Sequence, residues 1–214
     1  MNRRRVVRDA LAIGIAVGAY GLGFGAAGVT AGLSVLQTSA LSLLVFTGAS
    51  QFALVGVIGA GGSLLAGVAS ALLLGSRNTL YAVRLAGLLG LQGPRRLLAA
   101  QGTIDETTAM ATGAPEELAG VAFWVTFAAV YGCWNLATLI GALGAGALDT
   151  RALGLDAAVG AAFLALLAPQ IRNRTGGLVA VAGAAIAAVA IPFTSAGLPV
   201  LIAAIAVVPA VARR

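Results

Sequence analysis

The feature that most constrains this chain is an uncharged stretch from Ala10 to Ser76, in which 67 consecutive residues include no Asp, Glu, Lys or Arg. A helix that crosses the hydrocarbon core of a bilayer needs about 20 apolar residues, so this stretch has room for about three membrane segments. Over the whole sequence 60% of residues are hydrophobic and 9% are charged, against roughly 25% charged in soluble domains. The chain is therefore predicted to be an all-α, polytopic integral membrane helical bundle. A soluble enzyme, a disordered regulator and a nucleic-acid-binding domain are excluded.

Seven apolar segments are predicted within a single membrane domain that covers residues 1–214. Clusters of Gly, Ser and Pro separate the segments, and a polar connector is expected at residues 93–117. The first segment is too long for the apolar region of a signal peptide, so it is expected to be an uncleaved first span. The segments are expected at about residues 10–32, 34–60, 63–91, 119–147, 153–171, 176–191 and 197–212.

The distribution of arginine restricts the topology. Four blocks of Arg are placed at Arg3, Arg4, Arg5 and Arg8; Arg95 and Arg96; Arg172 and Arg174; and Arg213 and Arg214. Two spans separate the second block from the third, and two more separate the third from the fourth. Because cations beside spans favour the cytoplasmic side, the N-terminal block is expected there too. This requires an even number of crossings before Arg95.

The predicted topology thus has about six full crossings plus one broken or re-entrant segment within residues 34–93. The protein is expected in the cell (inner) membrane, surrounded by the lipid bilayer, with both termini in the cytoplasm. The alternative is three ordinary spans in this region with weak topology signals.

Two short polar sequences are candidates for the break: Gly48-Ala-Ser-Gln51 and Gly75-Ser-Arg-Asn-Thr79. Non-helical backbone at membrane depth is tolerated only where it is buried in protein or lines a cavity, and interrupted helices mark the binding sites of transporters. Candidate substrate-binding residues are therefore Ser50, Gln51, Arg77 and Asn78. Hydrogen bonding between helices is the alternative role for the amide of Gln51, and snorkelling to the interface is the alternative for Arg77.

Trp134 and Asn135 lie about midway through the fourth apolar run. An aromatic side chain beside a polar amide at this depth is a second candidate for contact with a substrate. Packing in the core of the bundle is the alternative for both residues.

The polar connector holds the sequence Thr103-Ile-Asp-Glu106. Thr followed three residues later by Glu is typical of a capping box, so a helix is expected to start here. Because Asp156, near the start of the span at 153–171, is the one carboxylate within the predicted spans, Asp105 and Glu106 are candidates for proton coupling.

Glycines in the first span recur every three or four residues. They are Gly14, Gly18, Gly21, Gly25, Gly28 and Gly32. This spacing places them on one helix face, where small residues let another backbone approach closely. We expect a packing face rather than a substrate groove. Its partner could be this chain, a second copy or a different subunit.

The sequence offers few groups for chemistry. It contains no His, one Cys and no Lys, so a zinc or haem site, a disulfide framework and a nucleophile–base pair of the usual kind are not expected. The chain is predicted to have no metal, no cofactor, no enzymatic activity and no nucleic-acid partner.

Together these residues resemble the AzlC/YgaZ family, the large subunit of branched-chain amino acid exporters. The matching parts, in chain order, are Phe46-Thr-Gly-Ala-Ser-Gln-Phe52, Arg77-Asn-Thr-Leu-Tyr81, Asp105-Glu-Thr107, Trp134 with Thr138 and Gly141, and Leu155-Asp156 leading to Phe163-Leu-Ala-Leu-Leu167. The family often has His after the Arg, where this chain has Asn78. A gating or proton-moving role of that His would be absent or altered here.

The resemblance implies a secondary transporter that exports branched-chain or similar hydrophobic amino acids and acts with a small hydrophobic AzlD-like partner subunit. The glycine face of the first span is then a candidate docking surface for that partner. The alternative is a non-transporting membrane scaffold or assembly subunit.

Overall fold

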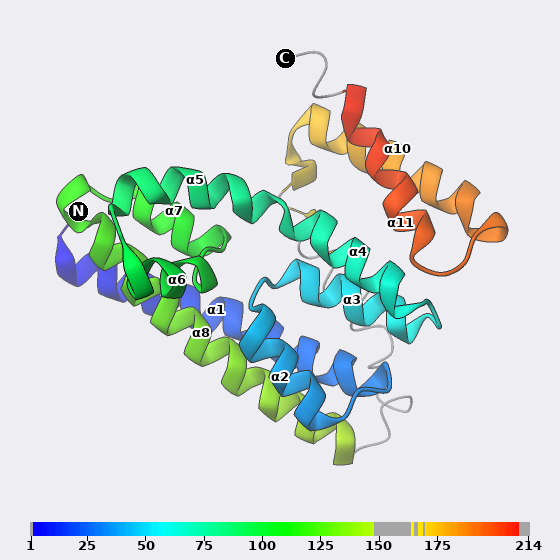
Figure 1. Cartoon of the computed structure of the whole chain (residues 1–214), viewed down its shortest axis with the longest axis horizontal. Coiled ribbons are helices and arrows are strands. Elements are labelled where there is room, and N and C mark those ends of the chain that lie inside the picture. Colours follow the sequence, from blue (N-terminus) through cyan, green and yellow to red (C-terminus); the bar gives the residue numbers. More distant parts are fainter. Residues whose placement is uncertain (1, 148–163, 165–166, 169, 210–214) are drawn as a thin grey trace.

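The computed structural model of the chain describes residues 2–147, 164, 167–168 and 170–209, and every regular element in these residues is helical. The α-helices are α1 (Arg3–Thr30), α2 (Val35–Val45), α3 (Ala49–Gly59), α4 (Leu64–Gly75), α5 (Arg77–Leu89), α6 (Gly93–Gln101), α7 (Asp105–Gly113), α8 (Glu116–Ala147), α10 (Arg174–Ala190) and α11 (Leu198–Ala203) (Figure 1). Among the described residues, the helices long and apolar enough to cross a membrane are Arg3–Thr30, Glu116–Ala145 and Arg174–Phe193.

Helices α1 and α8 pack side by side along most of their length and run in the same direction. The residue numbers of the contacts rise along both helices: Gly14 lies against Ala129, Gly18 against Cys133, Gly21 against Trp134 and Gly25 against Thr138. A Cβ atom added at Gly14 would lie 2.9 Å from the backbone carbonyl carbon of Ala129. The glycines thus bring the two backbones closer than larger side chains would allow. We call this contact the α1–α8 seam.

Helix α2 leads back from the end of α1 toward the middle of the bundle. It starts beside the C-terminal part of α1, where Thr38 lies against Gly28. It ends at Phe46, whose ring packs 4.9 Å from the ring of Tyr131, about halfway along α8. The 11 residues of α2 span about 16 Å at 1.5 Å per residue, which is about half of a ~30 Å hydrocarbon core.

Helix α3 returns to the end at which α2 started (Figure 1). Its last residue, Gly59, approaches Ala31, next to the C-terminus of α1. Gly48 makes the reversal possible because it adopts φ 62°, in the left-handed region that glycine tolerates best. Residues 34–60 therefore form a helical hairpin, and the predicted break lies at Gly48-Ala-Ser-Gln51.

At the second candidate for the break, residues 75–79, helices α4 and α5 join and the chain does not reverse direction. Ser76 between α4 and α5 keeps right-handed helical angles (φ −56°, ψ −28°) and its N–H bonds to the Leu72 carbonyl oxygen at 2.9 Å. The Ser76 hydroxyl donates to the Leu73 carbonyl oxygen at 2.7 Å. Such a side-chain bond competes with the backbone hydrogen bonds of the helix. Figure 1 shows α5 continuing in the general direction of α4. Of the two candidate sequences, Gly48-Ala-Ser-Gln51 is therefore the one at which the chain reverses.

The polar connector folds into a second hairpin, made of α6 and α7. Its tip reaches α8, where Gly102 lies directly against the ring of Phe127. The capping box predicted from Thr103 to Glu106 does not form, and a single side-chain contact to the helix start lies one residue later. The amide of Ile104 donates to Thr107 Oγ1 at 3.1 Å, whereas Thr103 bonds back to the Ala99 carbonyl oxygen at 2.8 Å.

The start of α1 and the connection from α5 to α6 lie at the same end of the long axis (Figure 1). This arrangement is compatible with the even number of crossings that the arginine blocks favour, while the total of six crossings stays a prediction. The predicted span 153–171 lies almost entirely outside the described residues. The break expected between the segments at residues 176–191 and 197–212 is present, because α10 ends at Ala190 and α11 begins at Leu198.

Candidate functional site

The turn of the α2–α3 hairpin and the turn of the α6–α7 hairpin meet at the C-terminal end of α2. Gln101, the last residue of α6, donates from Nε2 to the Leu43 carbonyl oxygen at 2.9 Å and to that of Leu44 at 3.3 Å. The Tyr131 hydroxyl donates to the same Leu43 oxygen at 3.1 Å. The last carbonyls of a helix have no partners within it, so side chains from α6 and α8 satisfy them here.

The start of α3 touches the end of α4 at Ser50. This side chain is 2% exposed, and a Cβ atom added at Gly75 would lie 3.2 Å from its hydroxyl oxygen. The two polar sequences singled out as candidates for the break therefore lie side by side. We call the group formed by Ser50, Arg77, Asn78, Tyr81 and Asp105 the polar junction.

An ion pair joins α5 to α7 within the polar junction. Arg77 Nη2 lies 2.7 Å from Asp105 Oδ2, and the Tyr81 hydroxyl donates to Asp105 Oδ1 at 2.7 Å. Arg77 and Tyr81 share one face of α5 because they are one helical turn apart. The side chains of Arg77 and Asp105 are 39% and 43% exposed, so the pair is accessible from outside the packed core.

Several buried polar atoms at the junction have no hydrogen-bond partner within the described part of the chain. They are Ser50 Oγ, Arg77 Nε and Asn78 Oδ1. A buried donor or acceptor left unpaired costs about 1–3 kcal/mol. The junction thus presents both donors and acceptors, which suits a ligand that carries both kinds of group.

Glu106 lies next to the ion pair, in the first turn of α7 and outside the predicted spans. Burial raises the pKa of its carboxyl group above the ordinary value of 4.5, and the neighbouring Asp105 carboxylate raises this pKa further, while Arg77 lowers it. Burial thus makes Glu106 easier to protonate than an ordinary Glu.

An apolar groove of about 440 Å³ runs between α5 and α6. Thr79 and Thr103 lie at its wall, and its apolar lining includes Ala82, Val83, Ala86, Leu89 and Ala100. Helical periodicity places Thr79, Ala82 and Ala86 on the face of α5 opposite to Arg77 and Tyr81. The groove therefore lies on a different face of α5 from the ion pair.

Gln51 does not lie free at this site. Its side chain is fully buried, its Oε1 accepts from the Gly48 amide at 3.0 Å, and its Nε2 donates to the Leu41 carbonyl oxygen at 3.1 Å. The amide therefore holds the turn between α2 and α3. This corrects the expectation that Gln51 contacts a substrate.

Trp134 and Asn135 are also part of the packing. Trp134 is 4% exposed, and its ring stacks on Phe24 of α1 with centroids 5.9 Å apart. Asn135 Oδ1 accepts a hydrogen bond of 2.7 Å from the Ser42 hydroxyl, which ties α8 to α2. Both residues were candidates for substrate contact; the structure buries Trp134 in the core and leaves Asn135 half-buried at its contact with α2, which favours packing, the alternative role.

The glycine face of α1 is covered by the chain itself. Gly14, Gly18, Gly21 and Gly25 lie against α8, and Gly28 lies against α2. Their role in packing is within the chain, so the expectation that this face receives a partner subunit is corrected.

Two residues of the site, Tyr81 and Gln101, were not among the candidates. Tyr81 follows Arg77 by one helical turn, and this spacing was the available signal for a shared contact. Gln101 is the polar end of a short helix with no regular pattern around it, and nothing local indicates that it reaches α2.

Comparison with known proteins finds a family match that covers this site. The family model described as AzlC protein matches residues 12–148, which hold the whole polar junction. An uncharacterized membrane protein from Archaeoglobus fulgidus is 32% identical over 174 residues, covering 74% of this chain and 74% of that protein. No solved structure matches the chain.

Proposed function

Because the chain belongs to the AzlC family of membrane proteins, we propose that it is the large subunit of a secondary transporter for branched-chain or similar hydrophobic amino acids. The proposed direction is export across the cell (inner) membrane, with both termini in the cytoplasm. The resemblance that implies this role rests largely on residues around the polar junction.

The polar junction is the observation that carries the proposal. The Arg77 guanidinium suits a carboxylate because its planar fork matches the two carboxylate oxygens. The Asp105 carboxylate, with the unpaired oxygens of Ser50 and Asn78, suits an ammonium group. The apolar side chain of the amino acid would need apolar walls beside these charges. Apolar walls discriminate weakly, since one methylene is worth about 1–3 kcal/mol, so several related amino acids would be carried.

We further propose that Glu106 couples transport to protons, with Asp105 as its neighbour at the site. A carboxyl group whose pKa is raised by burial exchanges its proton nearer to neutral pH than an ordinary Glu. A small hydrophobic AzlD-like subunit is the proposed partner. It would dock away from the glycine face, because α8 covers that face.

Efflux from cells loaded with a leucine-containing dipeptide tests the proposal. Leucine efflux should depend on the chain, and Arg77→Gln should reduce it at least ~10-fold, the effect of a loss of about 1.4 kcal/mol. Arg8→Gln is the matched control, because Arg8 is exposed on α1 and pairs only with Asp9 in the described structure. Efflux that is unchanged when the chain is deleted would favour the non-transporting scaffold.

A further inference from the structure

We propose that an amino acid zwitterion binds by separating the Arg77–Asp105 ion pair. Its carboxylate takes the place of Asp105 on the guanidinium, and its ammonium group pairs with the displaced Asp105 carboxylate. This inference rests on the proposed function and adds to it a specific mode of binding, in which Asp105 is an internal substitute for the substrate carboxylate.

The first argument is that Asp105 fills only part of the arginine fork. The described contact is a single one, from Arg77 Nη2 to Asp105 Oδ2 at 2.7 Å. The other carboxylate oxygen accepts from the Tyr81 hydroxyl at 2.7 Å. Arg77 Nε is buried and has no hydrogen-bond partner in the described residues. A carboxylate that accepts from both nitrogens makes the stronger, bidentate contact, so a substrate carboxylate has an advantage over Asp105.

The second argument is that the ion pair is open to exchange. Both side chains are more than one third exposed, and ion pairs that remain in contact with solvent contribute little net stability. Asp105 would also stay close after displacement, because Tyr81 holds its other oxygen from the same face of α5. A modest shift of α7 relative to α5 would suffice to admit a ligand.

The third argument is charge balance. Separating Arg77 from Asp105 with nothing between them leaves two charges without partners. A zwitterion restores both contacts and keeps the site neutral, whereas a ligand with only a carboxylate leaves Asp105 unpaired. A ligand with only an ammonium group leaves Arg77 unpaired. Glu106, the neighbouring carboxyl group, has a raised pKa and so competes less for the ammonium group.

Three ligands distinguish the binding of a zwitterion from the binding of a molecule with a single charge. Leucine carries both charges, 4-methylpentanoate keeps the carboxylate and the side chain, and leucinamide keeps the ammonium group and the side chain. Their affinities are measured by displacement of radiolabelled leucine from the purified full-length chain, together with any subunit that copurifies. In the wild type, each single-charge ligand should bind at least ~10-fold more weakly than leucine, the effect of losing about 1.4 kcal/mol.

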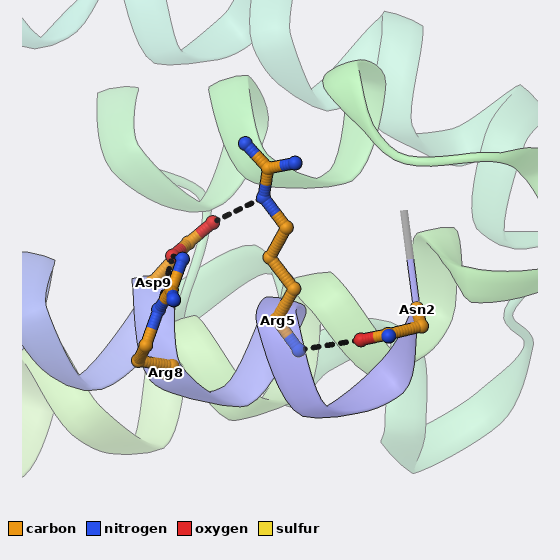
Figure 2. Close-up of polar contacts among 4 residues, drawn as sticks. All are labelled: Asn2, Arg5, Arg8 and Asp9. Carbon is orange, nitrogen blue, oxygen red and sulfur yellow. Dashed lines mark hydrogen bonds and ion pairs between the residues drawn. The ribbon is translucent and has the colours of Figure 1, made fainter.

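The Asp105→Asn variant inverts this preference. Asn keeps the size of Asp but offers no charge to Arg77 or to an ammonium group. Leucine affinity should fall, affinity for 4-methylpentanoate should rise, and the ratio of the two should shift at least ~10-fold toward 4-methylpentanoate. Asp9→Asn is the matched control. Figure 2 shows Asp9 paired with Arg5 and Arg8 on α1, in ion pairs confined to one exposed helix end. Its ratio should equal that of the wild type.

Each outcome decides the inference. A ratio that Asp105→Asn leaves unchanged, in a wild type that binds leucine, overturns the ion-pair mechanism and leaves the proposed function standing. A wild type that neither binds nor exports leucine overturns both. If Asp105→Asn does not fold, as judged by size-exclusion chromatography, the wild type decides alone. Binding of 4-methylpentanoate as tight as that of leucine then contradicts the mechanism.

Discussion

The α1–α8 seam and the polar junction belong to one bundle but follow opposite principles. At the seam, glycines bring two long helices into backbone contact, as at Gly14 with Ala129 and Gly25 with Thr138. At the junction, the α2–α3 hairpin and the α4–α5 joint interrupt regular helix, and buried polar atoms such as Ser50 Oγ have no partner in the described residues. The seam is complete without a ligand, whereas the junction is not.

This difference between the seam and the junction predicts which substitutions should affect folding and which should affect transport. A contact between backbones cannot relax, so enlarging a seam residue displaces a whole helix. An unpaired polar group at the junction costs stability in the free protein, and a ligand that pairs with it recovers that cost on binding. Substitutions at the junction should therefore change flux more than stability.

Gly25→Leu should have the largest effect, loss of the folded protein. A Cβ atom here would overlap the Thr138 carbonyl and approach the Ala142 backbone nitrogen at 2.7 Å. Overpacking typically costs about 1–3 kcal/mol, and more where backbone must move. The measurement is the yield and the melting temperature after purification in detergent. Gly23→Leu, on the same helix, is the control, because nothing lies within 4 Å of its added Cβ atom. Equal behaviour of the two variants would argue against the seam.

Arg77→Lys should reduce leucine flux ~10-fold while the melting temperature changes by less than ~2 °C. Lysine keeps the charge that pairs with Asp105 but lacks the planar fork that binds a carboxylate through two nitrogens. The measurement compares initial efflux rates with thermal unfolding of the same preparations. If instead stability fell sharply and the flux per folded molecule were unchanged, Arg77 would belong with the structural residues.

Asn135→Leu should lower stability by about 1–2 kcal/mol and leave the substrate preference unchanged. The substitution removes the acceptor of the Ser42 hydroxyl, which is 1% exposed and bonds at 2.7 Å. Part of the cost is offset because Ser42 also lies 3.2 Å from Thr138 Oγ1. A double-mutant cycle with Ser42→Ala measures the coupling between the two side chains. A change in the relative affinities for leucine and valine would instead return Asn135 to the substrate site.

Glu106→Gln should make stability less dependent on pH. Burial raises the pKa of Glu106 in the folded state above 4.5, so the folded protein binds this proton more tightly than the unfolded chain. The wild type should therefore lose stability as the pH rises from about 4.5 through the raised pKa, and Glu106→Gln should lack this loss. Melting temperatures measured across this range test the prediction, with Glu116→Gln in the exposed first turn of α8 as the control. Parallel pH profiles of Glu106→Gln and wild type would count against it.

Local sequence signals predicted where two of the helices start. Gly and Ser clusters mark the turns before α2 and α4, where Ser34 and Ser63 cap the helices that follow. The spacing of the glycines predicted a packing face on α1 because helical periodicity determines which residues share a face. These features depend on short stretches of chain, which is why the sequence was sufficient.

The partners of polar residues were harder to predict. Gln51, Trp134 and Asn135 each needed a neighbour in the membrane, but sequence alone could not distinguish a substrate from another part of the chain. The ion pair between Arg77 and Asp105 depends on the fold of the α6–α7 hairpin, which brings together residues 28 positions apart. No local pattern encodes such a contact.

The reversal of the α2–α3 hairpin is the central claim, because it brings Ser50 beside the α4–α5 joint. Its most direct test is the sidedness of single cysteines at Asn2, Ala60 and Gln92, each exposed, in a Cys133→Ala background. A membrane-impermeant thiol reagent added to one side of the membrane should label Asn2→Cys and Gln92→Cys together. Ala60→Cys should react only from the opposite side. Labelling of Asn2→Cys and Gln92→Cys from opposite sides would contradict the hairpin.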